Sequence, residues 1–274
     1  MKFTTLAFFL ASPILAGCQN TASPPTTVEP PHQVGLARGI DLPIDASDVL
    51  NELKSSQLDF VARYYRDPAS RWPTLSASEV QRLSSLGLKI VTVWEWHSHD
   101  PAYFSYASGY SDALGAYRQA KGVAQPTGSA IYFAVDFNAN ALDLPQVDQY
   151  FRGIAAGFAA AGNGRPDYKV GVYGSGAVCD ALKRAGLAQY AWLSNARAWT
   201  GASSYIGWNI KQSGQFANLS FSHDSNEAKD DYGGFRLAND ATDASSVATV
   251  APAVATPQAP AQAQTFANMI RSWF

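Results

Sequence analysis

Four segments with the composition of buried strands end in an acidic residue: Asp41, Glu95, Asp136 and Asp224. The clearest of them is 131–138, an apolar run that meets polar sequence at Asp136. A continuous apolar run is typical of a strand that is buried on both faces. Paired carboxyl groups can cleave a glycosidic bond, because one protonates the leaving oxygen while the other acts as a nucleophile or as a base for water. That chemistry requires the four strand ends to meet in space.

The elements that must position these residues alternate along 36–238. Strand-like segments are separated by segments of helical periodicity, and this alternation predicts βαβ units with a parallel sheet. Eight predicted strands with five clear helices between them indicate a small (β/α)8 TIM-like barrel that is partly degenerate in its second half. An open, doubly wound sheet is the alternative, but no glycine-rich phosphate motif follows the first strand. The predicted strands are 39–41, 59–65, 88–96, 131–138, 168–173, 190–194, 207–212 and 219–224.

The helices are predicted around 47–58, 76–87, 108–124, 145–162 and 176–186. Ser76 and Glu79 have the spacing of a capping box at the start of the second helix, and Gly87 is expected to end it. Cys179 lies in the last of these helices and is expected to be a small buried apolar residue, because its neighbours in the sequence include no base.

In a barrel, the carboxyl ends of the strands converge on one mouth, so the four acidic residues are predicted to form the catalytic site. Glu95 stands between two tryptophans; an indole packed against its carboxyl group would raise its pKa and suit it as the acid. Asp136 would then be the ionised partner. Arg63 is interpreted either as a cleft residue or as part of a structural ion pair. The residues predicted to bind substrate are Arg63, Tyr64, Trp94, Asn138, Tyr173, Trp192 and Gln212.

Several of these motifs, in this order, resemble a bacterial glycoside-hydrolase-like domain that is related to the family-25 lysozymes. The motifs are 39–41, 62–65, 134–138, 171–174 and the segment from Gln212 to Asp224, so that the resemblance covers about 36–237. It implies a barrel that acts on the glycan of the cell envelope. Family-25 lysozymes carry Asp-x-Glu at the fourth strand, with the Glu as general acid. Here that position is Asn138, which cannot donate a catalytic proton.

Two interpretations follow from Asn138. Either Glu95 takes the acid role, or the barrel binds a glycan without cleaving it. A third possibility is a metal-dependent hydrolase, because His97 and His99 follow the third strand and His223 precedes Asp224. A His-x-His pair in a loop is a weak signal, and the sequence predicts neither a metal nor another cofactor.

The N-terminus has the pattern of an export signal. A positive charge at Lys2 precedes a short apolar stretch, 6–15, and then Leu15-Ala16-Gly17-Cys18, which resembles the lipobox of bacterial lipoproteins. The resemblance implies cleavage before Cys18 and acylation of that residue, so the membrane is a predicted partner through a lipid anchor. Because Gln19 rather than Asp follows the cysteine, the outer membrane is the expected location in a Gram-negative host.

The remaining organisation follows from composition. Residues 1–17 are the predicted signal peptide, 18–35 a Pro/Thr-rich tether, 36–238 the barrel, 239–264 a low-complexity linker and 265–274 either a short amphipathic segment or a disordered end. The formal net charge is -2, without a block of like charges. Binding to nucleic acid needs a concentrated basic face, so nucleic acid is not an expected partner.

Overall fold

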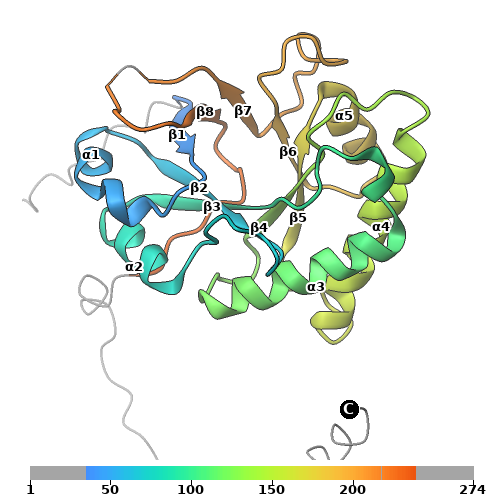
Figure 1. The fold of residues 1–274 in the computed structure, drawn as a ribbon, viewed down its shortest axis with the longest axis horizontal. Coiled ribbons are helices and arrows are strands. Elements are labelled where there is room, and N and C mark those ends of the chain that lie inside the picture. Colours follow the sequence, from blue (N-terminus) through green and yellow to red (C-terminus); the bar gives the residue numbers. More distant parts are fainter. Residues whose placement is uncertain (1–34, 217, 239–274) are drawn as a thin grey trace, which may run out of the picture. The chain divides into compact units, whose positions relative to one another are not determined.

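Eight strands pair in sequence order into a closed barrel (Figure 1). The computed structural model describes residues 35–216 and 218–238. Strands β1 to β7 run parallel to their neighbours, whereas β8 is antiparallel to both β7 and β1 and closes the barrel. The predicted TIM-like barrel is therefore confirmed. The strands are β1 (Ala37–Asp41), β2 (Phe60–Tyr65), β3 (Lys89–Trp94), β4 (Ala130–Ala134), β5 (Lys169–Gly174), β6 (Tyr190–Leu193), β7 (Ile210–Ser213) and β8 (Asp224–Ala228).

The helices lie outside the strands (Figure 1). None of them occurs among the described residues between β6 and β8, so the second half of the barrel is degenerate as predicted. No helix in the described ranges is both long enough and apolar enough to cross a bilayer. The helices are α1 (Leu50–Ser55), α2 (Ala77–Ser85), α3 (Tyr106–Gly122), α4 (Leu144–Ala161) and α5 (Gly176–Arg184), with short 3-10 turns at Ala46–Val49 and Pro101–Tyr103.

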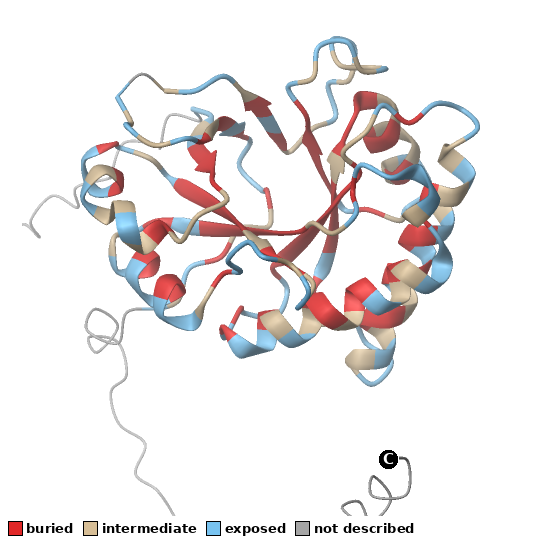
Figure 2. Ribbon diagram, viewed as in Figure 1, coloured by how far each residue is buried: buried red, intermediate tan, exposed pale blue. Residues whose placement is uncertain are grey.

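The core has two layers because successive residues of a strand point to opposite faces. One set of apolar side chains packs between the sheet and the helices, and the other fills the inside of the barrel; Figure 2 shows the strands almost wholly buried. Two glycines make room for the rings inside. A Cβ at Gly39 would lie 2.5 Å from the ring of Phe60, and one at Gly171 would lie 2.5 Å from the ring of Tyr132.

The capping box at α2 forms only by half. The Ser76 hydroxyl accepts the Glu79 N–H at 3.2 Å, as predicted. The Glu79 carboxylate, however, accepts from the backbone N–H of Ala46 and from Arg63. Glu79 is fully buried, so its carboxylate stabilises contacts to neighbouring elements instead of capping its own helix. Gly87 ends the helix with φ of +85°, a left-handed conformation that glycine adopts easily.

The last strand differs from its prediction. It was expected over 219–224 with Asp224 at its carboxyl end, but β8 begins at Asp224. Because β8 is antiparallel, its first residue lies at the mouth, and the register pairs Asp224 with Asp41. The predicted position of Asp224 at the mouth is thus right, although the predicted strand was wrong. The predictions for 1–34 and 239–274 lie outside the described residues.

Candidate active site

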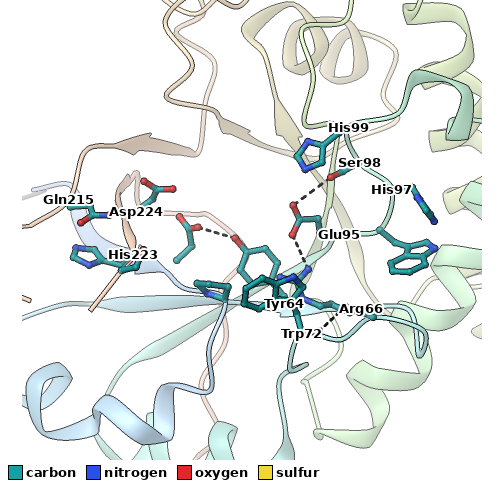
Figure 3. Close-up of a pocket in the computed structure, with 15 residues that line it drawn as sticks. Tyr64, Arg66, Trp72, Glu95, His97, Ser98, His99, Gln215, His223 and Asp224 are labelled. Atoms are coloured by element: carbon teal, nitrogen blue, oxygen red, sulfur yellow. Dashed lines mark hydrogen bonds and ion pairs between the residues drawn. The ribbon is translucent and has the colours of Figure 1, made fainter. Parts of the chain in front are cut away.

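The four acidic residues meet at the mouth of the barrel. Asp41 ends β1, Glu95 follows β3, Asp136 lies two residues beyond β4 and Asp224 begins β8. All four line a cavity of about 140 Å³. The cavity adjoins a groove of about 470 Å³ (Figure 3). Asp41, Tyr64, Glu95 and Asp224 line both. The other residues of the cavity are Tyr64, Val93, Tyr173, Trp192 and Gln212.

Asp41 and Asp224 form the first carboxylate pair. The side-chain amide of Gln212 donates to both, at 3.2 Å to each carboxylate. Asp41 also accepts from the Tyr64 hydroxyl at 3.0 Å and from the Asn226 amide at 2.8 Å. Burial raises the pKa of Asp41 to about 6, and the charge of Asp224 acts in the same direction against these hydrogen bonds. Burial also raises the pKa of Asp224.

Glu95 and Asp136 form the second pair. A carboxylate oxygen of each lies within 4.8 Å of the other and of a His99 ring nitrogen. The Arg66 guanidinium lies 3.1 Å from the Glu95 carboxylate, and His99 Nδ1 lies 3.0 Å from that of Asp136. Burial raises the pKa of Asp136, helped by the charges of Glu95 and Asp224 and opposed by His99. The Arg66 guanidinium is therefore the partner of the Glu95 carboxylate. The prediction of Glu95 as the acid required an indole in that place.

The inner walls of the cavity are tied to the carboxylates by hydrogen bonds. The Tyr173 hydroxyl donates to the Gln212 amide oxygen at 3.0 Å, so that Gln212 is held from both ends. Trp192 is only 1% exposed, and its indole N–H donates to Asn226 at 2.8 Å. Tyr64, Tyr173, Trp192 and Gln212 therefore all lie at the cavity, as predicted; their binding of substrate remains a prediction.

Comparison with known proteins assigns the domain. Residues 51–245 match the model of the Rv2525c-like, glycoside hydrolase-like domain. The chain belongs to this family. The family resemblance expected from the motifs is thereby confirmed.

Individual relatives are more distant. The uncharacterized protein YbfG of Bacillus subtilis is 30% identical over 141 residues, which make up 50% of this chain but only 19% of YbfG. The Tat-secreted protein Rv2525c of Mycobacterium tuberculosis, solved with L-tartrate, is 22% identical with a TM-score of 0.58. The alignment covers 73% of this chain and 99% of Rv2525c, and it shows the shared fold. A family 25 glycosyl hydrolase from Bacillus anthracis aligns over 72% of this chain and 93% of its own, at 14% identity and a TM-score of 0.45.

Two residues predicted to bind substrate in this glycoside-hydrolase-like domain face the helices instead. Arg63 is fully buried, with its Nε 2.5 Å from Glu79 and its Nη1 2.9 Å from the carbonyl oxygen of Leu42. Arg63 therefore forms a structural ion pair with Glu79, which is one of the two interpretations that the sequence allowed. Trp94 is 2% exposed and packs on α3, where a Cβ at Gly115 would lie 2.6 Å from its ring. The prediction that these two bind substrate was wrong, because each is adjacent in its strand to a residue that points inward.

Asn138 also lies away from the cavity. It is exposed, and its amide oxygen accepts the backbone N–H of Thr200 at 2.8 Å. Asn138 thus holds the connection that follows β6, and it is not among the residues that line the cavity or the groove. Its predicted contact with substrate is not supported by this placement.

The histidines do not converge. His97 has φ of +47°, and its ring packs 4.4 Å from that of Trp96, away from Glu95 (Figure 3). Both ring nitrogens of His223 are used: Nε2 accepts the Phe216 N–H at 3.0 Å, and Nδ1 contacts the Phe221 carbonyl oxygen at 2.8 Å. Of the three histidines in the described ranges, only His99 reaches the carboxylates. With Glu95 and Asp136 it could supply three ligands for a divalent ion, but the predicted His-x-His pair is not part of that set.

Four residues at the site were not predicted from the sequence. Arg66 continues the inward-facing positions of β2, two residues beyond Tyr64, and its guanidinium stacks 4.3 Å from the Tyr64 ring. Counting alternate residues past the strand end would have found it. Asn226, by contrast, becomes visible only through the antiparallel register of β8. His99 was considered solely as a metal ligand, and the exposed Trp72 at the groove gave no signal in the sequence.

Proposed function

We propose that this domain binds a glycan of the cell envelope, polysaccharide or peptidoglycan, at the barrel mouth and cleaves its glycosidic bonds with Glu95 and Asp136. The observation that carries the proposal is that carboxylate oxygens of these two residues lie within 4.8 Å of each other. Carboxyl groups about 5–5.5 Å apart suit a mechanism that retains the anomeric configuration, whereas about 6.5–9.5 Å leaves room for water in an inverting mechanism. The nearest oxygens of Glu95 and Asp136 are thus close enough for the retaining geometry.

The surroundings of the two carboxyl groups favour Asp136 as the acid. Burial raises its pKa, so it can hold a proton for the leaving glycosidic oxygen. Glu95, paired with Arg66, attacks the anomeric carbon as a carboxylate and forms a glycosyl ester. In the second step Asp136 takes a proton from water, the water oxygen bonds to the anomeric carbon, and Glu95 is released. These roles are the reverse of those that the sequence suggested.

The rest of the mouth would hold the sugar. Asp41, Asp224 and Gln212 offer carboxylate and amide groups to hydroxyls at the inner end of the cavity. Trp72 and Trp96 line the groove outside it, and Trp72 is 49% exposed. Aromatic rings with one accessible face are suited to stacking on sugar rings. The match to a glycoside-hydrolase-like family supports the same class of ligand.

The test is the release of new reducing ends from peptidoglycan glycan strands by the full chain. Glu95→Gln and Asp136→Asn are each expected to lower kcat by about 10²–10⁴-fold. Asp148→Asn is the matched control, because Asp148 lies on α4 in an exposed ion pair with Arg152. All three variants should keep the thermal transition of the wild type. Unchanged turnover in Glu95→Gln or in Asp136→Asn would contradict the proposed pair.

A non-catalytic glycan-binding domain is the second candidate. It is favoured by Asn138, an amide where the resemblance expects an acid, and by its use in holding the Thr200 backbone. In that case the wild type binds the glycan strands, as measured by co-sedimentation, and releases no reducing ends. The same assay therefore decides between the two candidates.

Export and lipid anchoring are part of the proposed function. The motif Leu15-Ala16-Gly17-Cys18 supports both, and the Tat secretion of Rv2525c supports export of a related domain. In a Gram-negative host, Gln19 favours the outer membrane. Labelled palmitate should be incorporated into the wild type and into Cys179→Ser, whose cysteine is buried, but not into Cys18→Ser. Equal labelling of all three would refute acylation at Cys18.

A further inference from the structure

A second cavity lies beside the carboxylate-lined mouth. It has a volume of about 640 Å³ and lies where β6 and β7 end. Its lining contains two cations and no carboxylate, which is the opposite of the mouth. The polar residues that line it include Arg197, Lys211, Ser194, Asn195, Ser203 and Gln212.

Within the part of the chain that the structure describes, neither cation of this cavity forms an ion pair. Among the described residues, no carboxylate oxygen lies within 4.0 Å of the charged nitrogens of Arg197 or Lys211. Glu227 stands opposite Lys211 in the register of β7 and β8, yet the two do not form an ion pair. Both cations are exposed, so their attraction for a ligand should be sensitive to salt.

The second cavity adjoins the candidate active site at Gln212. This residue lines both cavities, is 6% exposed, and donates to Asp41 and Asp224. Ser194 lines the second cavity, and its hydroxyl lies 3.2 Å from the hydroxyl of Tyr173, which lines the first. One polymer could therefore place neighbouring groups in both cavities.

We propose that the second cavity binds an anionic substituent, carboxylate or phosphate, carried by the glycan next to the sugar at the mouth. The inference rests on the proposed function and narrows its substrate class to acidic glycans. The ionised carboxylates among the four acidic residues of the mouth repel an anion, so an acidic group of the glycan is better held elsewhere. Guanidinium and ammonium groups bind both kinds of oxyanion, and the hydroxyl and amide groups around them complete such a site.

The test compares polymers that share one backbone: glycol chitin, which is neutral, carboxymethyl chitin and phosphorylated chitin. The wild type is expected to bind at least one acidic polymer about tenfold more tightly than glycol chitin at low salt, with the preference shrinking as salt rises. The acidic polymer that binds more tightly identifies the oxyanion. The double variant Arg197→Gln/Lys211→Gln should lose the preference and bind glycol chitin like the wild type.

The control removes the same two charges elsewhere. Lys54→Gln/Arg165→Gln changes an exposed lysine on α1 and an exposed arginine between α4 and β5, and it should keep the preference. Loss of the preference in this control would mean that net charge alone is responsible and would overturn the site. Equal binding of neutral and acidic polymers by the wild type overturns the anion site and leaves the glycan cleft standing. Failure to bind any of the polymers overturns both.

Discussion

The environment of Asp41 at the mouth disfavours the ionised form of its carboxyl group. Burial raises its pKa to about 6, more than the hydrogen bonds from Asn226, Gln212 and Tyr64 can offset. A carboxyl group with a higher pKa in the folded than in the unfolded chain binds more protons when folded. Its contribution to stability is therefore fully present below the unfolded value of about 4 and is lost as the pH rises through 6. Such a cost at a cleft is typical of a site that serves function rather than stability.

Asp41→Asn should remove this titration. The difference in unfolding free energy between the variant and the wild type is expected to shift in favour of the variant by about 2–3 kcal/mol from pH 4 to pH 7. Urea unfolding at the two pH values measures it. Asp148→Asn, which removes a partly exposed carboxylate outside the cavity, is the control for the loss of one negative charge. A difference that is the same at both pH values would mean that Asp41 titrates normally in the folded protein.

A raised pKa does not by itself mark the active site. Burial also raises the pKa of Asp112 to about 6, but this residue lies on α3 and accepts from the hydroxyls of Tyr103 at 2.7 Å and Tyr150 at 2.6 Å. It lines neither the cavity nor the groove of the mouth. Asp41 differs because it lines the cavity at the mouth together with three other acidic residues.

At the scale of the element, the alternation of a strand decides which residues reach the cleft. Two pairs of neighbouring residues were predicted to lie in one cleft, Arg63 with Tyr64 and Trp94 with Glu95. Successive side chains of a strand point to opposite faces, so only one member of each pair can face the barrel interior. Tyr64 and Glu95 face inward, while Arg63 pairs with Glu79 on α2 and Trp94 packs on α3.

Replacing one partner of the Arg63–Glu79 pair should destabilise the fold. Arg63→Met or Glu79→Gln leaves a buried charge without its partner, which typically costs about 3–5 kcal/mol. The double variant should cost less than the sum of the two single variants, because no unpaired charge remains. Urea unfolding of all four proteins measures the coupling. At urea concentrations below their unfolding transitions, the variants should bind glycan as the wild type does. Weakened binding without a loss of stability would indicate that Arg63 contacts the glycan.

At the scale of the whole molecule, β8 closes the barrel. Its five residues pair with β1 and four of them pair with β7, so it supplies both missing edges at once. It also carries Asp224, which lines the cavity, and Asn226, whose amide donates to the Asp41 carboxylate. Without it, β1 and β7 would expose unpaired backbone groups, which favour aggregation.

Truncation before and after β8 tests this closure. A chain of residues 35–238 should unfold cooperatively with a Tm within a few degrees of that of the full chain. A chain of residues 35–222 should show no cooperative transition by circular dichroism and should aggregate. A cooperative transition in the shorter chain would show that the barrel folds without β8. A large fall in Tm for the longer one would mean that the barrel depends on residues outside 35–238.

The sequence by itself determined the barrel, the family and the gathering of four acidic residues at one mouth. Its motifs indicate the family, and the carboxyl ends of successive parallel strands must meet on one side, whatever the details of packing. Only the tertiary structure decided that Glu95 pairs with Arg66 and that Asp41 is held by Asn226, 185 residues away in the chain. The tertiary structure likewise decided the direction of β8 and the outward orientation of Arg63. Burial, register and the distance between two carboxylates depend on closure between remote segments, whereas sequence patterns report on near neighbours.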